Sequence, residues 1–175
     1  MKVIAFAASN SSSSINKQLV TYAASQLEGI NVEVLDLNDF ELPLFSQDKE
    51  NELGQPAFAH AFLKKVQSAD ALLISFAEHN GSYTAAYKNL FDWVSRIEPK
   101  VYQDKPVVLL STSPGPGGAK NVLAAAEASM PFFGAEVKAT LSVPSFYENF
   151  DAENGGIIHP HLNDKVVTTV QLLQQ

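Results

Sequence analysis

The sequence contains no cysteine among its 175 residues. Disulfide bonds, thiolate nucleophiles and cysteine-ligated metal sites are therefore excluded. Lysine and arginine form no block, and the formal net charge is -7, so a nucleic acid is not an expected partner. No apolar run approaches the length that spans a bilayer, and the first run, 3–8, is too short for the core of a signal sequence. We therefore expect a cytoplasmic protein without a membrane partner.

Hydrophobic residues make up 46% of the chain and charged residues 18%, a balance typical of globular proteins and not of disordered ones. A chain of this length can bury a sizeable core and is most often one structural unit. We therefore expect a single domain over residues 1–175.

The segment 3–16 organises the rest of the chain. It begins as a short apolar run and continues into five serines and two asparagines within positions 9–16. Apolar residues then recur at helical spacing, which predicts a helix that starts near Ile15 and ends near Gly29. The unpaired N–H groups and positive dipole end of a helix suit an anion such as a phosphate. Alternatively, one of the serines simply caps the helix.

Apolar runs alternate with helical periodicity along the rest of the chain. Four further strands are predicted, at 31–37, 69–77, 105–113 and 135–143. Four further helices are predicted, at 56–68, 84–97, 121–134 with an interruption near Pro131, and 162–175. Two long segments, 38–55 and 144–161, are expected to be irregular, and the apolar residues at 40–45 are expected to cover a ligand or a partner subunit.

Strands that alternate with helices predict right-handed crossovers and a parallel sheet covered by helices on both faces. Five strands and five helices fit an α/β fold of the flavodoxin-like, doubly wound, three-layer type, with strand order 2-1-3-4-5. Such sheets bind ligands outside the carboxyl ends of their strands, where the strand order reverses. This rule brings together three loops, at 9–16, 77–83 and 111–120, and all three are rich in Ser, Asn, Gly or Pro.

Other uses of these residues are weighed against this site. The segment 114–120 lacks the Gly-Lys-Ser/Thr end of a nucleotide P-loop, and no G-x-G-x-x-G follows a strand. His159 and His161 have no third ligand nearby, so we expect a surface loop and no metal site. His79 is either an acid–base group or, as we favour, a neutral packing residue. No nucleophile elbow accompanies a Ser-His-Asp set, so we expect no catalytic triad.

At these three loops the chain resembles the NADPH-dependent FMN reductases of the flavodoxin-like superfamily. The family pattern G-S-x-R-x-x-S-x-N is matched by A-S-N-S-S-S-S-I-N at 8–16. The patterns P-E-Y-N-G-S and K-N-x-x-D-W-x-S-R are matched at 77–82 and 88–96. The pattern K-P-V … S-x-S-P-G … G-G is matched at 105–107 and 111–118. The resemblance covers most of the chain, and its middle motif is the most specific.

The resemblance implies bound FMN, with NADPH or NADH as co-substrate and a quinone, a free flavin or a similar small molecule as electron acceptor. It implies no catalytic side chain, because the flavin carries the chemistry. It also implies a homodimer or homotetramer whose subunits complete each other's flavin pockets. The implied cofactor-binding residues are Ser9, Ser11, Ser14, Ile15 and Asn16 at the phosphate, Glu78, His79, Asn80 and Gly81 along the ring, and Ser113, Gly115 and Gly118 at its other edge.

Two residues depart from the family pattern. Ser11 stands where the family has arginine, which removes a cationic, bidentate phosphate contact. His79 stands where the family has tyrosine, which changes the contact with the ring. Phosphate binding would then depend on neutral donors and the helix end. Ser14→Ala or Asn16→Ala is therefore expected to weaken FMN about tenfold or more without affecting riboflavin, whereas equal losses would indicate a helix cap only.

Two other functions are compatible with the same residues. A non-enzymatic, flavodoxin-like electron carrier would bind FMN without being reduced quickly by NAD(P)H. A flavin-free scaffold protein would take up no FMN and would be colourless.

Overall fold

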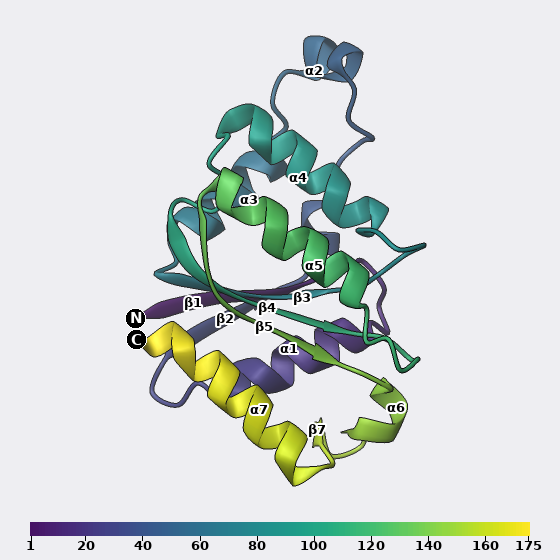
Figure 1. The fold of residues 1–175 in the computed structure, drawn as a ribbon. Helices are drawn as coiled ribbons and strands as arrows, with labels where there is room; N and C mark the ends of the chain where they lie inside the picture. Colours follow the sequence, from purple (N-terminus) through teal and green to yellow (C-terminus); the bar gives the residue numbers. More distant parts are fainter.

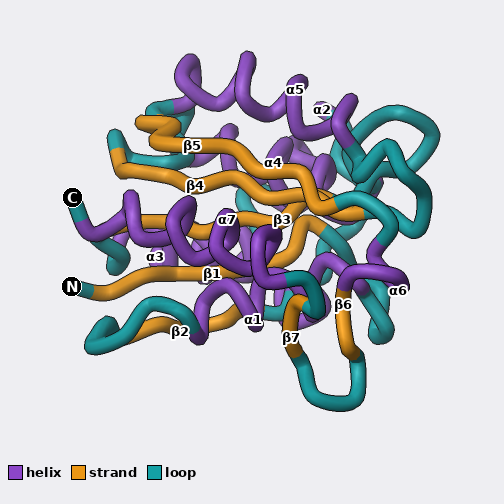
Figure 2. Tube along the Cα trace, turned by 60° about the horizontal axis from the view of Figure 1, so that its bottom comes forward, coloured by secondary structure: helices purple, strands orange, loops and turns teal.

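Five parallel strands form the centre of the computed structural model, which describes residues 1–175. The strands are β1 (Lys2–Ala8), β2 (Asn31–Leu35), β3 (Ala71–Phe76), β4 (Lys105–Thr112) and β5 (Ala135–Val143). Every neighbouring pair is parallel, and the order is β2-β1-β3-β4-β5 (Figure 2). This confirms the predicted doubly wound sheet, in which the order reverses between β1 and β3.

Helices cover both faces of the sheet, as Figure 1 shows. One face carries α1 (Ile15–Ser25) and α7 (Pro160–Gln171). The other face carries α3 (Ala57–Gln67), α4 (Ala85–Ile97) and α5 (Lys120–Ser129). None of the helices combines the length and the apolar character needed to cross a membrane.

The apolar runs became central strands because both of their faces are covered. Along β1, Ile4 and Phe6 join the core under α3 and α4, whereas the alternating Val3 and Ala5 join the core under α1 and α7. All four side chains are at most 1% exposed. Successive side chains of a strand point to opposite faces, so a central strand has to be apolar at every position.

The segment 38–55 was predicted to be irregular, and this prediction was wrong for α2 (Gln47–Leu53). Helix α2 is exposed and stands apart from the body in Figure 1. Hydrophobic periodicity could not reveal this helix, because none of its residues is buried. Its signals are local. The hydroxyl of Ser46 caps it by accepting from the Lys49 N–H at 3.1 Å, and Gly54 ends it with a positive φ of 67°.

Three further regions differ from the sequence prediction. Helix α1 ends at Ser25 and not near Gly29, where a φ of 73° belongs to the turn into β2. Strand β2 ends early because the Asp36 side chain accepts the Asn38 N–H at 2.9 Å and starts the 3-10 helix η1 (Leu37–Phe40). The segment 144–161 contains α6 (Phe146–Asn149) and a hairpin of β6 (Phe150–Asp151) and β7 (Gly156–Ile157).

Candidate functional site

The loop between β1 and α1 presents free backbone donors. The Ser14 hydroxyl caps α1 by accepting a hydrogen bond from the Lys17 N–H at 3.2 Å. The N–H groups of Ser13, Ile15 and Asn16 have no acceptor within the protein. Because a hydroxyl that accepts still has its own proton to donate, Ser14 can cap the helix and bind an anion at once. The helix cap and the anion site are therefore compatible here.

Asn16 has a structural role that the sequence interpretation did not foresee. Its side chain is 2% exposed and joins α1 to the ends of two strands. Its Oδ1 accepts from the Ser75 hydroxyl at 2.8 Å and from the Thr112 N–H at 3.0 Å, and its Nδ2 donates to the Thr112 carbonyl at 3.1 Å. The Asn16 side chain is therefore already bonded within the protein, and only its backbone N–H is free for the predicted phosphate contact.

The three predicted loops converge on a cavity of about 220 Å³. The predicted site residues that line it are Ser9, Ser11, Ser14, Ile15, Asn16, Glu78, His79 and Ser113. Ser13, Ala77, Thr112, Pro114 and Tyr147 complete its wall. Asn80, Gly81, Gly115 and Gly118 do not line it. The cavity lies at the carboxyl ends of β1, β3 and β4, where a doubly wound sheet places its ligand.

The charged side chains near this cavity are occupied by the protein itself. Lys17 forms an ion pair with Asp36, and its hydrogen bond lowers the pKa of the Asp36 carboxyl below its ordinary value. Glu78 lines the cavity, but its carboxylate accepts from the Val122 N–H at 2.9 Å and the Asn121 side chain at 3.2 Å. Its negative charge thus faces the positive end of α5. Hydroxyls and backbone N–H groups are left to meet a ligand.

The turn predicted at Asn80 and Gly81 is present in the second loop. Both residues have positive φ, 52° and 77°, and His79 and Ser82 exchange backbone hydrogen bonds of 3.0 and 3.1 Å across the turn. This is the geometry of a two-residue turn for which Asn-Gly is preferred. His79 reaches the cavity wall, whereas the contacts of Asn80 and Gly81 with the flavin ring stay predictions.

The glycines of the third loop shape the loop from within. Gly118 is buried, and its carbonyl accepts from the hydroxyls of Ser111 at 2.7 Å and Ser142 at 2.8 Å. The Gly115 carbonyl accepts from the Ser145 N–H at 2.9 Å, which ties this loop to the segment before α6. Their contacts with a cofactor stay predictions, and the structure gives both glycines a packing role.

Sequence reasoning missed four polar or aromatic residues around the site. Ser75 and Thr112 are fully buried near the carboxyl ends of otherwise apolar strands, a position that was itself a usable signal. The Thr84 hydroxyl caps α4 and donates to the Ala8 carbonyl at 2.9 Å, so it joins the first two loops. Tyr147 reaches the cavity from the segment 144–161, and no local pattern marked it.

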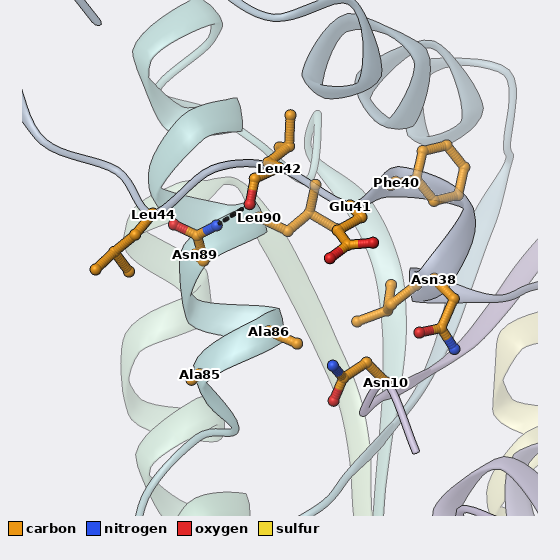
Figure 3. A pocket seen from close by; sticks show the side chains of 11 residues that line it. Asn10, Asn38, Phe40, Glu41, Leu42, Leu44, Ala85, Ala86, Asn89 and Leu90 are labelled. Carbon is orange, nitrogen blue, oxygen red and sulfur yellow. Dashed lines mark hydrogen bonds between the residues drawn. The ribbon is translucent and has the colours of Figure 1, made fainter. Parts of the chain in front are cut away.

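A second cavity of about 280 Å³ opens beside this site, between the segment after η1 and the first turns of α4 (Figure 3). Asn89 holds the segment in place by donating to the carbonyls of Leu42 and Pro43 at 3.1 Å each. Figure 3 shows Asn10 and Glu41 among the side chains that line the cavity. Because Asn10 belongs to the first loop, the two cavities are neighbours.

The donor set fits a phosphate ester that has an organic group attached. Free backbone N–H groups and hydroxyls converge on the first cavity, and no unpaired carboxylate repels an anion there. No group of three or more His, Asp or Glu side chains is placed to hold a metal ion. The geometry thus suits a phosphorylated cofactor, with space for a second molecule beside it.

A comparison with protein families matches residues 1–148 to the family described as NADPH-dependent FMN reductase. An NADPH:quinone oxidoreductase of Arabidopsis thaliana is 38% identical over 93 residues, which cover 53% of this chain and 46% of that protein. An NAD(P)H:quinone oxidoreductase of Solanum tuberosum is 32% identical over 125 residues, which cover 69% of this chain and 63% of that protein. The chain thus matches about half to two thirds of these two plant relatives.

Two further relatives match along almost the whole chain. An NAD(P)H-dependent FMN reductase of Pseudomonas aeruginosa is 27% identical over 177 residues, which cover 99% of this chain and 94% of that protein. The solved structure of FerB, a flavoenzyme NAD(P)H:(acceptor) oxidoreductase from Paracoccus denitrificans, superposes with a TM-score of 0.78 at 23% identity. That superposition covers 99% of this chain and 95% of the other, and it supports the fold.

Proposed function

Because the chain belongs to the NADPH-dependent FMN reductase family, we propose that it binds FMN and uses NAD(P)H to reduce a quinone, a free flavin or a similar small acceptor. A cytoplasmic location is part of the same proposal, since the reaction needs NAD(P)H.

One observation carries the proposal. The N–H groups of Ser13, Ile15 and Asn16 are free at the start of α1, beside a cavity lined by hydroxyls at the switch point of the sheet. A helix start with free donors is a binding site for phosphate groups, and the switch point is where such sheets bind their cofactors. FMN has one phosphate, and we expect it to bind at this loop.

When bound, FMN would supply the redox chemistry between NAD(P)H and the acceptor. The protein supplies position. The first loop would hold the phosphate, while the Asn80-Gly81 turn fixes His79 beside the cavity. Glu78, turned toward α5, fixes the second and third loops relative to each other. The second cavity would leave room for the nicotinamide or the acceptor.

Anaerobic mixing of the FMN-loaded protein with excess NADPH or NADH is expected to bleach the visible band of oxidised flavin. The expected rate is on the order of 1 per second or faster, as is typical of enzyme turnover. Stopped-flow absorbance measures it, and later addition of a quinone should restore the band.

The outcome separates the enzyme from its alternatives. A yellow protein that neither nucleotide bleaches would be an electron carrier, and the reductase proposal would fail. A colourless protein that takes up no FMN would be a flavin-free scaffold, and both flavin functions would fail. Free FMN mixed with the same nucleotide is the control for reduction without protein.

We also propose a homodimer or homotetramer. Of the apolar residues at 40–45, which were expected to cover a ligand or a partner subunit, Phe40 is only 8% exposed and offers little surface to a partner. What is left is Leu44, 79% exposed at the end of the second cavity, and the projecting helix α2, which buries no residue of its own. Apolar surface and an arm of this kind fit a second copy of the chain.

Light scattering at micromolar concentration is expected to give two or four times the chain mass of 19.0 kDa. Leu44→Asp should shift the equilibrium toward the monomer, because burying the aspartate charge in an apolar interface would remove its hydration. Ile158→Asp is the matched control, since Ile158 is 51% exposed and lies beyond β7, outside the Leu44 region. A wild-type protein found only at 19.0 kDa would refute the assembly.

A further inference from the structure

Two neighbouring aromatic residues in α6 have opposite environments. Phe146 is fully buried and stacks on Phe150 with ring centres 4.7 Å apart. Tyr147 is 69% exposed and lines the cavity of the serine loop. A single exposed aromatic residue needs no explanation by itself. Tyr147, however, lies on the cavity wall next to Phe146, which is anchored in the core, and this placement needs an explanation.

The backbone fixes Tyr147 relative to the third loop. The N–H of Ser145 donates to the Gly115 carbonyl at 2.9 Å, and the N–H of Phe146 donates to the Ser113 carbonyl at 3.0 Å. Ser145 has a φ of +45°, in the left-handed region that side-chain-bearing residues seldom adopt. Strained backbone of this kind persists where the surroundings enforce it, and it is frequent at binding sites. The turn therefore holds the backbone before Tyr147 against the third loop, and Tyr147 lies on the cavity wall.

The cavity also lacks the cation that a phosphate normally attracts. Ser11 occupies the arginine position of the family pattern, and Lys17 is paired with Asp36. Tyr147 is the only Phe, Tyr or Trp residue on the cavity wall, and its side chain is 69% exposed and makes no hydrogen bond within the protein. A phenol hydroxyl donates one hydrogen bond, and bonds to charged acceptors are the stronger ones.

We propose that Tyr147 is a phosphate-binding residue of this chain. Its ring forms the cavity wall on the side of the third loop, and its hydroxyl donates a hydrogen bond to a phosphate oxygen of FMN. It supplies from α6 a donor in addition to the hydroxyls and N–H groups of the first loop, which has serine at position 11. The inference rests on the proposed function, because it takes FMN as the ligand.

Titration of FMN and of riboflavin, followed by quenching of flavin fluorescence, tests this role. Tyr147→Phe keeps the ring and removes the donor, so it is expected to weaken FMN about tenfold and to leave riboflavin unchanged. Tyr147→Ala should weaken FMN at least as much. Phe132→Ala is the matched control, because Phe132 is 80% exposed and lies outside the cavity wall, and it should change neither affinity.

Three results would overturn the proposal. The first is a Tyr147→Phe protein that binds FMN as tightly as the wild type. The second is an equal loss of FMN and riboflavin affinity in that variant, which would make the hydroxyl a general contact. In either case wild-type FMN binding, and with it the proposed function, would stand. The third is a wild-type protein that binds neither flavin, which would end both proposals together. Because the hydroxyl has no partner in the protein, the melting temperature of Tyr147→Phe should match the wild type.

Discussion

The Asn16→Ala variant is expected to lose about 3 kcal/mol or more of unfolding free energy and to bind FMN and riboflavin equally poorly. The side chain makes three buried hydrogen bonds, to the Ser75 hydroxyl and to both backbone groups of Thr112. Alanine would leave these partners without a bond in the interior, where each unsatisfied group costs about 1–3 kcal/mol. The first loop would then lose the shape that both flavins need.

Urea unfolding, followed by the fluorescence of the single tryptophan Trp93, measures the loss, since this side chain is fully buried. Asn10→Ala is the matched control. Asn10 belongs to the same loop, is exposed, and makes no side-chain hydrogen bond, so its replacement should change stability by less than about 0.5 kcal/mol.

This expectation replaces the one drawn from the sequence, in which Asn16→Ala weakens FMN alone. An Asn16→Ala protein that unfolds like the wild type and loses only FMN would show that the side chain contacts the phosphate. It would contradict the structural role of the Asn16 side chain, which joins α1 to the ends of β3 and β4. Ser14→Ala still tests the loop itself, because the Ser14 hydroxyl both caps α1 and has a proton free for the phosphate.

The Gly118→Ala variant is expected to lose about 3 kcal/mol of unfolding free energy and most of its FMN binding. Gly118 has a φ of +60°, which costs a residue with a side chain about 1–2 kcal/mol. A Cβ there would lie 2.2 Å from the Ser142 hydroxyl and 3.2 Å from the backbone of Pro144. The hydroxyl would have to move and give up its bond to the Gly118 carbonyl.

Gly117→Ala is the matched control for this position. Gly117 has an ordinary φ, and a Cβ would meet no atom within 4 Å, so alanine there should be neutral or stabilise by about 0.4–1 kcal/mol. A double-mutant cycle with Ser142→Ala divides the Gly118 effect. The part due to the hydroxyl should return in the double variant, whereas the part due to φ and Pro144 should persist. A Gly118→Ala protein as stable as the wild type would contradict the packing role.

The two variants also show how far the site could be predicted. The three loops were located by the order of strands and helices, and the cavity lies among them. Composition and motif predicted the serine-rich loop and Ser113, which line the cavity, and the Asn80-Gly81 turn, whose two residues do not line it. The partners of Asn16 could not be recognised in this way, because Ser75 and Thr112 lie 59 and 96 residues away along the chain.

The sequence by itself determined the order of strands and helices and the doubly wound sheet. Those features follow from local periodicity and from the apolar runs 3–8, 69–77 and 105–113, which only a sheet covered on both faces can bury. Turn chemistry is equally local, since Asn-Gly favours positive φ wherever it stands. Helix α2 is the exception, because it buries nothing and its caps alone define it.

Only the tertiary structure decided which polar groups face a ligand and which face the protein. Asn16, Glu78 and Gly118 match the family pattern, yet their polar groups bond to α5, β3, β4 and β5. The N–H groups of Ser13, Ile15 and Asn16 are among the groups left free at the cavity. A donor or acceptor forms a hydrogen bond with the partner that the fold brings within about 3 Å of it. That partner depends on chain packing over long sequence separations, so residue type and spacing alone do not specify it.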